Sequence, residues 1–116
     1  MNLLLQVLQA HCPAAHRHLT CHVVKLLLIE SKSLPELARE VSTSFLSQLL
    51  PLLLGASEEW APSSIGCINT CIRQYPGACG VFKGKIESFI LLYLDREYPA
   101  EILDIWAHML TRLHTS

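Results

Sequence analysis

The sequence predicts an all-α protein, and three observations support this class. Prolines and glycines recur at intervals that suit helices. Between them, apolar residues follow the spacing i, i+3, i+4, i+7 of a helix with one buried face. No segment alternates apolar and polar residues beside an Asn-Gly or Asp-Gly turn, as a β-hairpin would. We therefore expect a HEAT- or armadillo-like α-solenoid segment, with a compact helical bundle as the alternative.

Six helices are expected, and they span residues 2–11, 14–31, 34–55, 61–75, 81–95 and 98–114. Prolines mark the starts of four of them, where a missing amide N–H costs little because first-turn amides have no helical partner. These prolines are Pro13, Pro35, Pro62 and Pro99. Gly55 follows "LLPLLL" and predicts the end of the third helix.

The third helix is expected to bend or break. The stretch "REVSTS" is weakly helical, and Pro51 removes a hydrogen bond from the helix interior. The break is predicted near Ser42–Ser44. The later helices are more regular, and their apolar faces carry Ile65, Ile68, Ile72 and Tyr75, then Phe82, Ile86, Phe89, Ile90 and Tyr93, then Ile102, Trp106, Met109, Leu110 and Leu113.

Composition sets further limits on the class of protein. The chain has 116 residues, the size of one domain, and is 51% hydrophobic and 16% charged, which predicts a folded core. Its net charge of −1 argues against a domain held to nucleic acid mainly by phosphate contacts. No apolar run reaches the roughly 18 residues of a membrane-spanning helix, so no membrane association is expected. The high apolar content predicts contact with a partner or with the rest of a longer helical-repeat domain.

The cysteines and histidines suggest no metal site. The five cysteines are odd in number and no secretory signal precedes them, which predicts free, mostly buried thiols in a reducing compartment. The stretch "HCPAAHRHLTCH" (11–22) is rich in zinc-ligand residue types. A structural zinc site usually takes its four ligands from two separated pairs, however, and no second pair has the required spacing. A solvent-exposed histidine face is the favoured interpretation.

No catalytic or cofactor-binding residues are identified. The chain lacks the G-x-S-x-G and H-E-x-x-H motifs and any loop motif around a cysteine, so we expect no enzyme and no cofactor. The stretch "QYPGACGVFKGK" (74–85) superficially resembles a phosphate-binding loop. A Walker A motif needs glycine at position 79 and a hydroxyl after the lysine, but these positions hold Cys79 and Ile86. The preceding segment also has a helical rather than a strand pattern.

The same stretch is instead expected to be a turn between two helices. Pro76 would end the preceding helix, and Gly77 and Gly80 would let the chain reverse through a left-handed conformation. Lys83 and Lys85 then stand at the start of the next helix, where the helix dipole disfavours cations. They are therefore candidates for contact with an acidic partner or an RNA phosphate, and the alternative is two solvated lysines.

The leucine-rich run offers a second candidate binding site. Leu46, Leu49 and Leu50 form an L-x-x-L-L motif, the kind that docks in hydrophobic grooves when the helix is exposed. The alternative is a buried helix of a leucine-rich helical protein.

One block of the sequence resembles a known family. "YPGACGVFKGK" followed by "IESF" is similar to the N-terminal helical domain of the Rix-type pre-ribosomal RNA processing family. The family pattern is an aromatic-Pro-x-Ala-Cys-Gly segment, here Tyr75–Gly80, leading into Lys-Gly-Lys at 83–85. The similarity covers roughly residues 20–114 and is strongest over 64–90.

The resemblance implies a non-enzymatic α-solenoid scaffold in the nucleus or nucleolus. It implies assembly with a WD-repeat subunit and a second helical-repeat subunit, and work on pre-60S particles during removal of an internal transcribed spacer. It implies no small-molecule substrate, and it leaves open whether RNA is contacted directly. The alternative function is that of a nuclear-receptor coregulator acting through L-x-x-L-L, with Leu46, Leu49 and Leu50 as the counterparts here. Family members are several times longer, so we expect this chain to be a fragment or a truncated form.

Overall fold

The computed structural model describes residues 2–9, 13–93 and 99–112. Every regular element in these ranges is helical, which confirms the all-α class. In chain order they are α1 (Asn2–Gln9), α2 (Ala14–Ser31), α3 (Pro35–Glu40), η1 (Val41–Phe45), α4 (Leu46–Leu54), α5 (Ala61–Gln74), α6 (Pro76–Cys79), η2 (Gly80–Phe82), α7 (Lys83–Tyr93) and α8 (Pro99–Arg112). The predicted helix ends at 10–11, 94–95, 98 and 113–114 lie outside the described residues.

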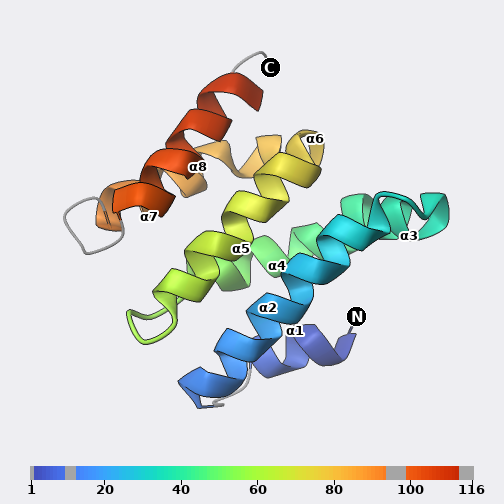
Figure 1. The fold of residues 1–116 in the computed structure, drawn as a ribbon, viewed down its shortest axis with the longest axis horizontal. Coiled ribbons are helices and arrows are strands. Elements are labelled where there is room, and N and C mark those ends of the chain that lie inside the picture. The colour runs from blue at the N-terminus through green and yellow to red at the C-terminus, as the bar shows by residue number, and fades with distance from the viewer. Residues whose placement is uncertain (1, 10–12, 94–98, 113–116) are drawn as a thin grey trace.

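The helices form two layers. In Figure 1, α2, α5 and α8 lie side by side toward the viewer, and α1, α4 and α7 lie behind them. Helix α5 occupies the centre and packs against α2 on one side and α8 on the other. The molecule measures 40 × 38 × 19 Å, and the shortest dimension is about two helix diameters. Successive antiparallel pairs, α1–α2, α4–α5 and α7–α8, therefore follow one another across a flat slab.

The third predicted helix is continuous but irregular. Between α3 and α4, residues Val41–Phe45 form a π-helix, at the place where a break was predicted. Hydroxyl groups explain the distortion, because Ser42 Oγ and Thr43 Oγ1 both donate to the Arg39 carbonyl, at 3.2 and 2.7 Å. Side-chain donors of this kind compete with the backbone amides of the helix. The helix ends at Leu54, before Gly55, as predicted.

The chain reversal after α5 differs from the prediction. Residues 76–82 form the short helix α6 and the 3-10 turn η2, and no described glycine has a positive φ. The expectation that Gly77 and Gly80 adopt a left-handed turn is therefore wrong. The chain turns at Tyr75, with φ −135° and ψ 59°. The ring of Pro76 disfavours the α conformation in the residue before it, so the proline dictates the turn and then begins α6.

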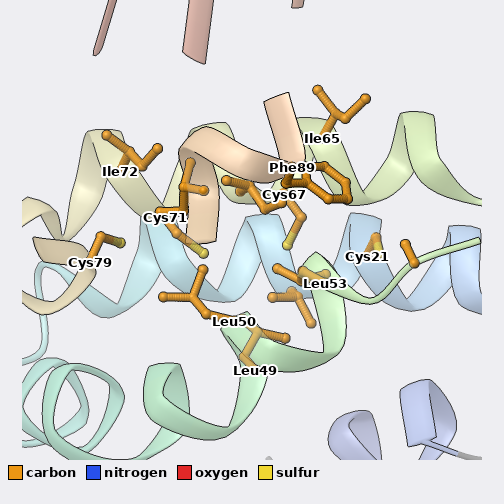
Figure 2. Packing of buried hydrophobic residues seen from close by; sticks show 14 of the residues in the cluster. Cys21, Leu49, Leu50, Leu53, Ile65, Cys67, Cys71, Ile72, Cys79 and Phe89 are labelled. Atoms are coloured by element: carbon orange, nitrogen blue, oxygen red, sulfur yellow. The ribbon is translucent and has the colours of Figure 1, made fainter. Parts of the chain in front are cut away.

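The core lies between the two layers. Figure 2 shows Leu49, Leu50 and Leu53 of α4 directed at Cys67 and Cys71 of α5. Phe89 of α7 joins the same cluster and stacks at a tilt on Tyr93, with 4.9 Å between the ring centres. Two short polar contacts tie the elements at the edge of this core. Ser64 Oγ of α5 donates to the Leu53 carbonyl of α4, and the hydroxyls of Ser31 (α2) and Tyr75 lie 2.5 Å apart.

Candidate partner-binding surfaces

The L-x-x-L-L leucines do not form an exposed docking surface. Leu46, Leu49 and Leu50 have 0% exposure and belong to the hydrophobic core. Figure 2 shows Leu49 and Leu50 on the side of α4 that faces α5. The spacing that places the three leucines on one helix face is the same spacing that lets the helix pack into a core. The prediction that they contact a partner directly is therefore wrong for this fold, and the buried alternative is correct.

The two lysines of the Gly-Lys segment stand at the start of α7, as predicted. Lys83 is half-buried and Lys85 is exposed. The amide of Lys83 already donates to the Gly80 carbonyl, because η2 runs directly into α7. A phosphate-binding loop instead presents several free amides to the ligand. The helical backbone therefore removes the phosphate-loop interpretation on geometric grounds, and the lysine side chains remain as the candidate contacts.

Lys85 borders a groove between α4 and α7. The groove has a volume of about 680 Å³ and is lined by Pro51, Leu54, Gly55, Val81, Gly84, Lys85, Ser88, Phe89 and Leu92. Its walls come from two segments far apart in the sequence, the end of α4 and the stretch from η2 through α7. Sequence reasoning missed it for this reason, although it did single out Pro51, Gly55 and Lys85 individually. The groove is mostly apolar, and Lys85 is its charged group.

The four cysteines in the described part of the chain are all buried and free. Cys21 of α2 lies beside Cys67 of α5 in the core, Cys67 in turn lies beside Cys71, and Cys79 is buried in α6. The hydrogen bond to Cys67, together with burial, raises the pKa of Cys21. At Cys67, the hydrogen bond with Cys21 lowers the pKa, but the hydrogen bond with Cys71 and full burial outweigh it and the pKa is raised. Burial also raises the pKa of Cys79 to about 12. Because their pKa values are raised, Cys21, Cys67 and Cys79 stay protonated near neutral pH, and a protonated thiol is a poor nucleophile and a poor metal ligand.

The histidine-rich stretch is divided between solvent and core. His16, His18 and His22 are exposed on α2, and Cys21 points the other way, toward α5. The His18 ring bonds to Ser63 of α5 instead of to a metal-ligand partner. Within the described residues, no three candidate ligands converge on one point. His11 and Cys12 lie outside those residues.

Comparison with known proteins identifies the family. The sequence profile of the RIX1 family, described as rRNA processing and ribosome biogenesis, matches residues 1–101. The chain belongs to the RIX1 family. It is 39% identical over 94 residues to proline-, glutamic acid- and leucine-rich protein 1 of Xenopus laevis, and 38% identical over 94 residues to that of Mus musculus. These matches cover 81% of this chain but only 9% and 8% of the two relatives.

This RIX1-family chain also exposes apolar side chains along two opposite edges of the slab. On one edge, α2 presents Leu19, Val23, Leu26 and Ile29. On the other edge, Leu91, Leu103 and Trp106 border a smaller apolar pocket of about 270 Å³ between α7 and α8. Contiguous exposed apolar groups usually mark a contact surface.

No helix among the described residues is long and apolar enough to cross a bilayer.

Proposed function

We propose that this chain is part of a non-enzymatic scaffold for pre-rRNA processing and assembly of the large (60S) ribosomal subunit in the nucleus. The main support is that the chain belongs to a family whose described role is rRNA processing and ribosome biogenesis. The structure supports the non-enzymatic part, because the described thiols are buried and the Gly-Lys segment is helical. The fold instead presents surfaces suited to protein contacts, namely one groove and two edges with exposed apolar side chains.

The slab is proposed to be one section of a longer helical repeat. Its three antiparallel pairs are stacked side by side, the order in which α-solenoids bury a continuous core. In such an array the exposed apolar groups at each edge would be covered by neighbouring repeats. The curated relatives, of which this chain spans less than a tenth, are long enough to supply them. The partners proposed for the assembled scaffold are a WD-repeat subunit and a second helical-repeat subunit.

Depletion and rescue in cells tests this function. Depleting the full-length gene product that contains this segment should cause precursors that retain the internal transcribed spacer of the large-subunit rRNA to accumulate, as measured by northern blotting. The tagged wild-type product should restore processing and co-purify with pre-60S assembly factors. Unchanged precursor levels, together with a purification that recovers no such factors, would contradict the proposal.

The coregulator alternative has no support at its expected site. Docking of Leu46, Leu49 and Leu50 in a receptor groove would require α4 to leave the core that these residues build. Such unpacking would expose three fully buried leucines, each worth about 1.5–3 kcal/mol of hydrophobic transfer free energy. Direct docking would therefore compete with the packing of α4 into the core.

A further inference from the structure

The groove between α4 and α7 arises from how the two layers are spaced. Helix α5 packs extensively against α8, whereas α4 and α7 contact each other only sparingly. The segment α6–η2 contacts α4 and leads into α7, so it sets α7 apart from α4. Gly84 on α7 lines this space without a side chain, and a Cβ built there would meet no heavy atom within 4 Å, so the glycine leaves the space open. The result is an open groove of about 680 Å³ in the layer that contains α1, α4 and α7.

The groove has an apolar surface beside one positive charge. Pro51 and Leu54 form the α4 wall, and Phe89 and Leu92 form the α7 wall. Val81 at one end is 85% exposed and Leu92 is 62% exposed, so this apolar surface is open to solvent. None of the nine lining residues is acidic, and the ammonium of Lys85 is the charged group among them.

We propose that this groove is the docking site for a peptide segment of a partner protein, in which leucine or aromatic side chains are flanked by aspartate or glutamate. The apolar walls would cover the partner's apolar side chains, and Lys85 would attract its carboxylates. The volume lies within the range of about 300–1,000 Å³ that is usual for ligand sites in proteins. RNA fits less well, since its phosphates need several cations and gain little from proline, leucine and phenylalanine.

The chain offers substitutions that block the groove without disturbing the fold. A Cβ added at Gly84 would meet no heavy atom within 4 Å, so a leucine there would extend into the open groove. The matched control is Gly77, where an added Cβ also meets nothing and which does not line the groove. Both glycines have helical neighbours, so leucine should raise helix propensity at each site. Lys85→Glu reverses the charge in the groove, and Lys83→Glu is its control outside it.

Peptide selection against the purified chain tests the proposal. The probe is a displayed library of random peptides about 12 residues long, enough for three helical turns. The enriched sequences are then synthesised with a fluorescent label, and their affinities are measured by anisotropy. We expect the enriched peptides to combine Leu, Phe or Trp with Asp or Glu. Gly84→Leu and Lys85→Glu should each weaken binding about tenfold or more, as expected when a central contact is lost. Gly77→Leu should leave it unchanged, and Lys83→Glu, outside the groove, should weaken it less than Lys85→Glu does.

Salt supplies an independent readout of the charge contact. Raising the ionic strength from about 0.1 to about 1 M shortens the Debye length from about 10 to about 3 Å. The wild-type affinity should therefore fall with salt, and the residual affinity of Lys85→Glu should not. Thermal unfolding of every variant, followed by circular dichroism, shows whether the variant is folded when binding is measured.

Several outcomes would overturn the assignment. A selection that enriches no peptide, peptides without acidic residues, or peptides that bind Gly84→Leu as tightly as wild type would each do so. A dimer in analytical ultracentrifugation that Gly84→Leu dissociates would assign the groove to a second copy of the chain. Binding of a labelled single-stranded RNA that Lys85→Glu abolishes would assign it to RNA. These measurements do not involve rRNA processing, so their failure is distinguishable from failure of the proposed scaffold function.

Discussion

Replacing Leu50 with alanine tests the burial of the L-x-x-L-L motif. The Leu50 side chain has 0% exposure and lies between α4 and α5, in contact range of the cysteine-rich face of α5. Leu50→Ala removes apolar atoms from the core and leaves a cavity that the surrounding helices only partly fill. The substitution keeps the helix propensity of α4 high, because alanine is the best helix former. Any loss of stability therefore reports lost packing.

The expected effect is large for a domain of this size. Leucine-to-alanine changes at buried sites destabilise proteins by roughly 2.7–5 kcal/mol, and the fully enclosed position predicts a loss of at least about 3 kcal/mol. For a chain of 116 residues, unfolding entropies of about 2.1 cal/mol/K per residue convert this loss into a fall of about 12 °C in Tm. Since a domain is typically stable by only about 5–15 kcal/mol, this is a substantial share of the total.

Urea and thermal unfolding, both followed by far-ultraviolet circular dichroism, measure the effect. The matched control is Leu19→Ala on α2, where the side chain is 62% exposed and the change should stay within about 0.5 kcal/mol. If Leu50→Ala proved as stable as Leu19→Ala, the packing of α4 described here would be wrong. If the prediction holds, L-x-x-A-A variants of this segment lose partner binding through unfolding, and such variants cannot demonstrate a direct contact.

Four further predictions concern the connector, the thiols and the tyrosine. Gly77→Ala and Gly80→Ala should each raise the free energy of unfolding by about 0.4–1 kcal/mol in urea, because neither glycine has a positive φ and an added Cβ meets open space. A lower free energy of unfolding would instead indicate that these glycines adopt the left-handed conformation. In a Cys12→Ser variant, the remaining thiols should resist a disulfide reagent until urea unfolds the chain, and rapid native-state labelling would contradict their burial. Burial raises the pKa of Cys79 from 9.0 to about 12, so the unfolded chain loses this proton first and the free energy of unfolding should fall as pH rises through that window. Tyr75→Phe removes the buried hydroxyl that bonds to the serine at the end of α2 and should cost about 0.5–1.5 kcal/mol in the same unfolding assay; no change would mean that this bond contributes nothing.

The sequence by itself determined the helices and the family. Helix positions depend on local features, namely the 3.6-residue periodicity, the prolines at helix starts and Gly55 at a helix end, and all of these can be read without knowing what packs against what. The irregular third helix was predictable for the same reason, because its hydroxyls and Pro51 act on their own backbone. The family was also recognisable from one local block, Tyr75 to Lys85, and the match to the family profile confirms the membership.

Only the tertiary structure decided what these elements present to a partner. An apolar helix face looks the same in sequence whether it is covered or exposed, so the burial of Leu46, Leu49 and Leu50 became known only when α5 was placed against α4. The gathering of Cys21 with Cys67 and Cys71, and of Pro51 with Lys85, likewise joins segments far apart in the chain. Contacts between distant segments depend on how whole helices pack against one another. A local sequence pattern shows that a helix has an apolar face, but it does not show which helix covers that face.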